Sequence, residues 1–143
     1  MQLTRYTDYS VRVLTHLSTY PDRLSCIAEI AKAYGISQSH LMKVVQDLGQ
    51  SGYVETVRGR HGGIRLRKPP AEINLGALVR HTEKHFDVVD CPGCLIAPAC
   101  QMTNVFAQAT RAFLEVLDRH TLADMMGRRT QLHRLFTSAA ERA

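Results

Sequence analysis

The sequence contains no long hydrophobic run and no export signal. No segment approaches the roughly 18 consecutive apolar residues that a membrane span requires, and the opening residues MQLTRY are not followed by the apolar stretch of a secretory signal. We therefore expect a soluble, cytoplasmic protein. Its 143 residues fit about one domain, or a small domain with an appendage, and a hydrophobic content of 45% can build a core.

Acidic residues are scarce in the first half of the chain. Residues 1–70 carry ten Lys and Arg against five Asp and Glu, whereas residues 71–143 carry eight of each kind. The whole formal excess of +5 therefore lies in the first half. A generic basic surface would spread over the chain, so an excess confined to one module indicates that this module meets a polyanion.

Two helices are expected at the start of the chain. The first closes at Pro21 and has one apolar face, formed by Tyr6, Val13, Leu14 and Leu17. The second begins after Ser25, which is expected to be its N-cap, and ends at Gly35, which can adopt the left-handed conformation of a sharp helix exit. Its apolar positions are Ile27, Ile30 and Ala31. Cys26 falls within this second pattern and is expected to be a small buried hydrophobe.

A third helix is expected to begin after Ser37 as its N-cap. Its apolar residues face inward and are Leu41, Val44, Val45 and Leu48. Polar and basic residues face outward near its start, and these are Gln38, Ser39, His40 and Lys43. A helix, a turn with glycine and a second helix with such a start is the arrangement that enters a DNA major groove.

A β-hairpin is expected next. Residues 53–57 and 64–67 are β-prone and partly alternating, three glycines lie in the link 58–63, and the stretch 57–68 holds five Arg or Lys and no acid. Such a basic, glycine-rich tip suits phosphate contacts or a narrow minor groove. The tip residues expected to contact DNA are Arg58, Arg60 and His61.

Each of these features also has a simpler explanation. Helix-turn-helix spacing occurs by chance, and a basic hairpin can be a solvated sheet edge whose charge prevents aggregation. The two features in this order, with the charge excess on the same side, favour binding to nucleic acid. The expected strands carry no aromatic platform for stacking bases, which favours DNA over RNA.

The second half is expected to hold a short helix, a cysteine-rich loop and one long helix. The short helix covers residues 73–79, and no helix breaker occurs in residues 101–120. The apolar stripe of the long helix consists of Met102, Val105, Phe106, Ala109, Ala112, Phe113, Val116 and Leu117. An amphipathic helix of this length has no obvious partner within the chain. Pairing with its copy in a second subunit is therefore favoured over packing against the first helix. Residues 121–124 have the spacing of a capping box that begins a further helix.

Three of the four cysteines fall within ten residues, namely Cys91, Cys94 and Cys100. Without an export signal, such a cluster is more often a metal or redox site than a disulfide framework. The loop ends at a helix N-terminus, which stabilises thiolates, and thiolates suit zinc or an iron–sulfur cluster. Structural zinc takes four protein ligands. The candidates for a fourth ligand are Asp87, Asp90, His81, His85 and a group elsewhere in a dimer.

Several segments resemble the NsrR/IscR/RirA family of winged-helix regulators, over residues 1 to about 135. The opening MQLT and the PAC end of the cysteine loop are most similar to the nitric-oxide-sensing branch. The other matching segments are Thr7-Asp8-Tyr9, Arg58-Gly59 with Gly62–Leu66 in the wing, the Cys-x5-Cys spacing before the long helix, and residues 120–124, HTLAD.

The resemblance implies a homodimer that binds a palindromic operator, with an iron–sulfur cluster that controls its affinity for DNA. The family's cysteine ligands map onto Cys91, Cys94 and Cys100, and the aspartate that the partner subunit supplies in the nitric-oxide-sensing branch maps onto Asp8. The iron–sulfur-biogenesis branch uses a His three residues after its last cysteine, where this sequence has Thr103. The family separates its first two cysteines by more than the two residues present here. This leaves three outcomes open: a strained 4Fe-4S cluster, a 2Fe-2S cluster, or one cysteine that is not a ligand.

Together these observations predict a mainly α fold with a small β-hairpin wing. A winged helix-turn-helix DNA-binding domain is expected over residues 1–75, and a cysteine loop with dimerisation helices over residues 76–143. The expected function is that of a repressor, not an enzyme, which senses nitric oxide through a cluster and releases its operator on nitrosylation. Two alternatives remain: a regulator of the same fold that senses iron or redox state through a cluster or a thiol switch, and a thiol oxidoreductase that uses the CxxC pair Cys91 and Cys94.

Overall fold

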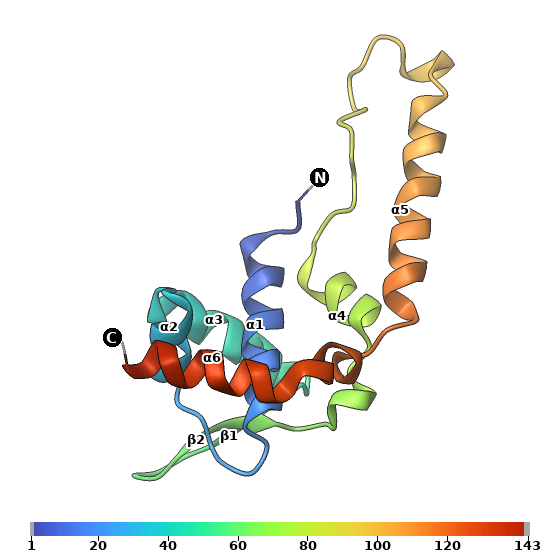
Figure 1. Ribbon diagram of the computed structural model, residues 1–143. Helices are drawn as coiled ribbons and strands as arrows, with labels where there is room; N and C mark the ends of the chain where they lie inside the picture. The colour runs from blue at the N-terminus through green and yellow to red at the C-terminus, as the bar shows by residue number, and fades with distance from the viewer. Residues whose placement is uncertain (1, 142–143) are drawn as a thin grey trace.

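The computed structural model describes residues 2–141. Figure 1 shows a folded body from which one long helix and the loop before it project. The elements in chain order are α1 (Arg5–Thr19), α2 (Ile27–Tyr34), α3 (Gln38–Gln50), β1 (Val54–Val57), β2 (Gly63–Leu66), the 3-10 helix η1 (Pro70–Glu72), α4 (Leu75–Thr82), η2 (Ala97–Ala99), α5 (Met102–Asp118), η3 (Leu122–Arg128) and α6 (Arg129–Glu141). The predicted class, mainly α with a two-stranded hairpin, is confirmed. Within the described residues, no helix has the length and apolar character needed to cross a membrane.

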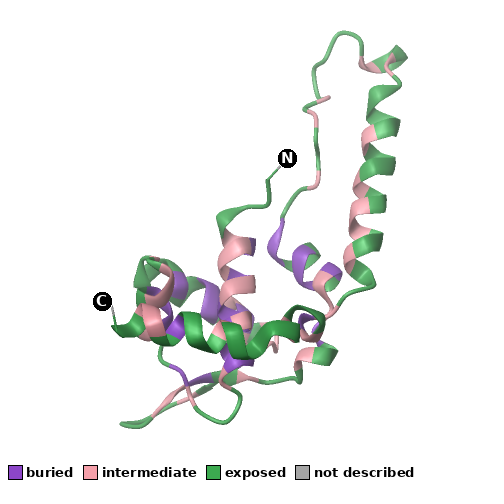
Figure 2. Ribbon diagram, in the orientation of Figure 1, coloured by how far each residue is buried: buried purple, intermediate pink, exposed green. Residues whose placement is uncertain are grey.

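The core lies between α1, α2, α3 and the hairpin, where Figure 2 shows most of the buried residues. Leu14 of α1 and Leu41 of α3 are fully buried there, in agreement with the inward faces predicted from their periodicity. The second half also contributes to this core, because Ile73, Leu78 and Leu122 are fully buried in the same cluster. The base of the second half is therefore packed into the helix-turn-helix body.

The start of α2 differs from the prediction. Ser25 pairs antiparallel with Ile64, and the two exchange backbone hydrogen bonds of 3.0 and 2.8 Å. This bridge keeps Ser25 extended, so the helix begins later and Cys26 is the N-cap, with its Sγ accepting from the Glu29 N–H at 3.4 Å. The expectation of a buried Cys26 is wrong, since the cap position leaves it exposed.

The turn between α2 and α3 follows the prediction. Gly35 has a φ of 63°, the left-handed conformation expected at the end of α2. Ser37 is the N-cap of α3, as predicted, although its hydroxyl bonds the Ser39 hydroxyl at 2.8 Å and caps no backbone N–H. The turn therefore sets the first residues of α3 at the surface.

The hairpin lies within one residue of its predicted bounds, with Val57 opposite Gly63 at the tip end. A Cβ on Gly62 would collide with the carbonyl oxygen of Val57, and one on Gly63 would lie 2.7 Å from the Ser25 carbonyl oxygen. Glycine is therefore required at both positions for the tip to close and for the wing to reach the segment before α2.

The long helix α5 stands away from α1. It packs against α4 near its own C-terminal end, and none of its residues is buried. Asp118 at that end forms a bidentate ion pair with Arg80 of α4, and the Asn74 side chain donates to the Asp118 carbonyl at 2.7 Å. The alternative of α5 packing along α1 is wrong: α5 is anchored at one end and extends outward (Figure 1).

The last segment returns to the body. The predicted capping box forms, with the Thr121 N–H donating to Asp124 at 2.7 Å, but the chain first makes the 3-10 helix η3 before α6. On α6, the Phe136 ring lies 4.8 Å from the His16 ring of α1 and 5.4 Å from the Tyr34 ring of α2, measured between centroids. Burial lowers the pKa of His16, whose ring packs against Phe136 while its Nε2 lies 3.3 Å from Glu29 Oε1.

Candidate DNA interface and cysteine loop

The predicted recognition residues of α3 are all exposed, and these are Gln38, Ser39, His40 and Lys43. They are displayed because the buried residues of the same helix, such as Leu41 and Val45, fix its opposite face in the core. The structure thus places hydrogen-bonding and basic groups together at the N-terminal end of α3, where a helix-turn-helix meets base edges.

The basic residues of the wing divide into paired and unpaired groups. Across the hairpin, Arg65 donates to both carboxylate oxygens of Glu55, at 3.0 and 3.3 Å, and the Lys68 ammonium lies 5.3 Å from the centroid of the Tyr53 ring. The predicted contact residues Arg58, Arg60 and His61 are exposed, and no ion pair within residues 2–141 occupies any of them. The tip therefore presents its charge to solvent, whereas Arg65 stabilises the hairpin.

Short-range backbone hydrogen bonds shape the cysteine loop. Backbone N–H groups of Cys94, Ala97 and Cys100 donate to carbonyls three residues earlier, at 3.0, 3.1 and 3.3 Å, and Gly93 supplies a left-handed turn with a φ of 81°. Cys94 is exposed, whereas Cys91 and Cys100 are half-buried, and all three thiols are free. Within the described residues no three Cys, His, Asp or Glu side chains are gathered as a metal site.

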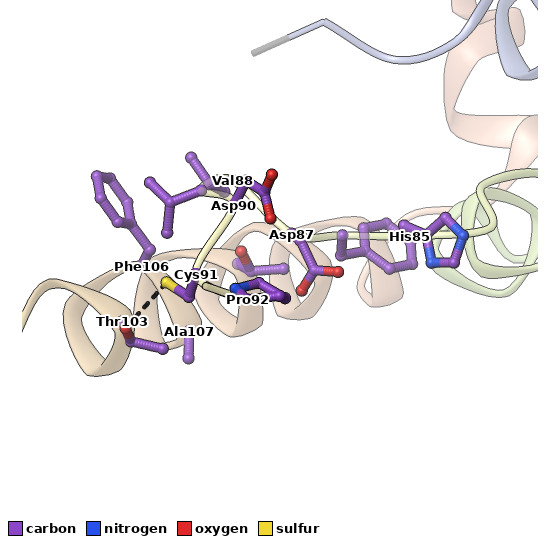
Figure 3. Close-up of a pocket in the computed structure, with 12 residues that line it drawn as sticks. His85, Asp87, Val88, Asp90, Cys91, Pro92, Thr103, Phe106 and Ala107 are labelled. Atoms are coloured by element: carbon purple, nitrogen blue, oxygen red, sulfur yellow. Dashed lines mark hydrogen bonds between the residues drawn. The ribbon is translucent and has the colours of Figure 1, made fainter. Parts of the chain in front are cut away.

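A cavity lies between this loop and the start of α5 (Figure 3). It is lined by apolar groups such as Phe106 and by the side chain of Cys91, whose Sγ lies 3.3 Å from the Thr103 hydroxyl. Thr103 was not predicted as a site residue, since nothing in the spacing of a lone threonine marks a contact with a cysteine. Of the candidates for a fourth ligand, His85, Asp87 and Asp90 also line this cavity.

The other candidate ligands are engaged elsewhere in the chain. Asp8 forms an ion pair of 2.9 Å with Arg12 one turn along α1, and it does not line the cavity. His81 contacts Asp47 of α3 and Ser51, the C-cap of that helix, each at 2.8 Å. The single chain therefore does not bring Asp8 or His81 to the cysteines.

The fold and the exposed basic surface define a winged-helix transcriptional regulator. The sequence profile of the Rrf2 family, described as iron-dependent transcriptional regulators, matches residues 3–128, and the chain belongs to this family. NsrR of Bacillus licheniformis is 46% identical over 143 residues, which cover 96% of this chain and 100% of that protein. NsrR of Bacillus subtilis is 48% identical over 141 residues, which cover 94% and 97%.

Solved structures show the same fold. IscR of T. potens has a TM-score of 0.72 and 25% identity, and the match covers 88% of this chain and 86% of that one. CymR, the global cysteine regulator of B. subtilis, has a TM-score of 0.71 and 24% identity, over 87% and 95% of the two chains. The predicted resemblance to NsrR-type regulators is confirmed by these comparisons, and so is the prediction that the protein is not an enzyme.

Proposed function

We propose that the protein is a homodimeric repressor that binds a palindromic operator and releases it in response to nitric oxide, sensed through an iron–sulfur cluster. The observation that carries this proposal is the set of three free thiols on a loop that projects from a DNA-binding body. The similarity of nearly the whole chain to NsrR regulators supports it. Since those relatives are bacterial, we place the protein in the cytoplasm, together with its DNA.

Two surfaces would contact the operator. The N-terminal end of α3 would enter the major groove, with Gln38, Ser39, His40 and Lys43 toward base edges and phosphates. The wing would lie over the adjacent backbone or minor groove with Arg58, Arg60 and His61. Support comes from the exposure of all seven side chains and from the absence, within residues 2–141, of ion pairs that would hold their charges elsewhere.

The α5 helix would join the two subunits. Part of its apolar stripe is open to solvent in the single chain, with Met102, Val105 and Val116 more than half exposed. An exposed apolar stripe at helical spacing favours association with a second helix of the same kind, because each helix covers the other's apolar side chains. Two copies would also present two α3 helices to the two halves of a palindrome.

The donor set fits an iron–sulfur cluster in its chemistry. Cys91, Cys94 and Cys100 supply three soft thiolate ligands at the N-terminal end of α5. We propose Asp8 of the partner subunit as the fourth ligand. When bound, the cluster supplies iron that nitric oxide can attack. A carboxylate is a harder and weaker ligand than a thiolate, so Asp8 is the ligand most easily displaced.

Asp8→Ala is expected to weaken cluster retention and leave the fold of the cluster-free protein intact. The fold should survive because the Asp8–Arg12 pair is a half-exposed ion pair within one helix, with 45% and 40% of the side chains exposed, and such pairs contribute little to stability. Cluster loss under a chelator, followed by visible absorbance, should be faster in Asp8→Ala than in Arg12→Ala, which breaks the same pair and keeps the carboxylate. Equal lifetimes would remove Asp8 from the site.

The proposal as a whole is tested on anaerobically purified protein. Iron and acid-labile sulfide are measured, and a visible spectrum and operator binding are recorded before and after nitric oxide. About four irons per dimer would indicate a 2Fe-2S cluster in each subunit, and about eight a 4Fe-4S cluster. We expect the visible absorbance and the operator affinity to fall together. Protein that stays colourless and iron-free after cluster reconstitution would contradict the proposal.

A thiol switch is the second candidate, and the exposure of Cys94 favours it. A thiol open to solvent can be oxidised without any metal. In that case the reduced, iron-free protein would bind the operator, and a mild oxidant would release it with the formation of a disulfide within residues 91–100. Mass spectrometry of the oxidised protein distinguishes this outcome from cluster-dependent control.

A further inference from the structure

The short helix α4 shares the apolar core with the DNA-reading helix α3 through Leu78, and one polar side chain of α4, that of His81, also reaches α3. His81 Nε2 lies 2.8 Å from Asp47 Oδ2 and 2.8 Å from Ser51 Oγ, both at the C-terminal end of α3. Because a carboxylate oxygen only accepts, the Nε2–H donates to Asp47. Burial, together with the nearby Asp47 carboxylate, raises the pKa of Tyr6 of α1 to about 12. Asp47 thus lies close to side chains of both α1 and α4.

The C-terminal end of α4 is fastened to α1. Glu83 follows α4 directly and is only 8% exposed. Its Oε1 accepts from the Thr4 N–H at 2.7 Å and from the hydroxyls of Thr4 and Thr7 at 3.0 and 2.5 Å. The Thr7 hydroxyl also lies 2.8 Å from that of Thr82. The point where the chain leaves α4 for the cysteine loop is therefore tied to the first turn of α1.

Helix α4 is also fastened to the C-terminal end of α5, through its N-cap and through Arg80 in its last turn. The Arg80 guanidinium pairs with both oxygens of Asp118, and Asn74, the N-cap of α4, bonds the Asp118 backbone. A Cβ on Gly76 would collide with the Asp118 carboxylate, so the two helices approach closely there. The chain thus leaves the C-terminal end of α4 as the cysteine loop, and it returns to α4 at the end of α5.

We propose that His81 is the positioning residue through which the state of the cysteine loop reaches α3. The segment made of the cysteine loop and α5 begins at α4 and is attached to α4 again at its other end, through Asp118. His81 is the α4 side chain that hydrogen-bonds the DNA-reading helix. A shift of α4 would move Asp47 and Ser51 and so change the angle at which α3 meets the groove. The inference rests on the proposed function, because it presumes that the loop has two states with different operator affinities.

The contact between His81 and Asp47 is partly exposed, which suits a residue that positions α3 without holding the fold together. The side chains of His81 and Asp47 are 35% and 33% exposed, whereas Leu78 and Val79 of the same helix are buried. The buried face gives α4 its packing, so loss of the His81 contact should leave the fold intact and change the placement of α3 alone. A mutation of His81 can therefore change the placement of α3 without unfolding the protein.

The test uses three variants of the full chain and operator DNA selected in vitro from random duplexes with this protein. His81→Leu removes the donor, His81→Gln keeps a side-chain N–H donor for Asp47, and His120→Leu is the matched control. His120 also lies near an aspartate, with its ring 3.8 Å from Asp124. For each variant, Kd for the operator is measured in the cluster-loaded and cluster-free forms, and melting temperature reports folding.

In the wild type we expect the two forms to differ in Kd by about tenfold or more, the usual size of an allosteric coupling. His81→Leu should reduce this ratio to about one, while His81→Gln and His120→Leu keep it. In the cluster-free chains, hydrogen exchange of the α3 amides should be faster in His81→Leu than in His81→Gln.

Two failures are distinguishable. A wild-type ratio of one would overturn the proposed function, and the inference with it. A wild-type ratio that persists in His81→Leu would overturn the inference alone.

Discussion

Val105→Glu is expected to convert the protein from dimer to monomer and to weaken operator binding by about 100-fold or more. Val105 is 59% exposed in the single chain and lies on the apolar stripe of α5, in the first turn of the helix. If this stripe forms the dimer interface, each subunit would place an unpaired carboxylate in an apolar contact, at a cost of several kcal/mol per dimer. Loss of the dimer also removes the second α3 helix from the operator, so the gain from bivalent binding is lost.

The matched control is Asn104→Glu. Asn104 is the neighbour of Val105 in sequence, is exposed, and lies on the opposite, polar side of α5. Sedimentation velocity measures the oligomeric state of both variants, and a gel-shift titration measures Kd. The control should remain dimeric with unchanged affinity. A Val105→Glu protein that stays dimeric would show that another surface joins the subunits.

The double variant Lys43→Ala, Arg60→Ala is expected to lower operator affinity by about two orders of magnitude. A dimer carries both residues twice, so four phosphate contacts would be lost. Because each contact releases a counterion, the slope of log K against log salt should become shallower by about 3 to 4. Melting temperature should be unchanged, since both side chains are exposed and no ion pair within residues 2–141 involves either of them.

Arg65→Ala is the control for the loss of positive charge. It removes a cation from the same hairpin, but that cation is already paired with Glu55 at 3.0 Å. A much smaller loss of affinity is therefore expected at low salt. If Arg65→Ala and the double variant weakened binding equally at moderate salt, net charge and not the assigned surface would account for DNA affinity.

Local patterns in the sequence predicted most of the elements. The spacing of Leu41, Val44 and Leu48 defined the buried face of α3, and so it also defined which residues remain at its surface. Gly35 predicted the helix exit because few other residues adopt a positive φ. The hairpin was predicted from β-prone residues and from glycines in the turn, which are also local features of the sequence.

Contacts between distant segments could not be predicted in this way. The extended conformation of Ser25 depends on its pairing with Ile64, which no local pattern reveals, and this is why Cys26 became the cap and reached the surface. The junction of His81 with Asp47 joins residues 34 positions apart, and each side chain by itself reads as an ordinary polar surface residue.

By itself, the sequence determined the class of the protein, because amphipathic helices, a basic hairpin and three clustered thiols are local features of composition and spacing. Only the tertiary structure decided that α5 projects from the body and that α4 is fastened to α1, α3 and α5. The physical reason is that helix packing and side-chain hydrogen bonds depend on which surfaces meet after folding. Periodicity specifies which face of a helix is buried but not which neighbour covers it.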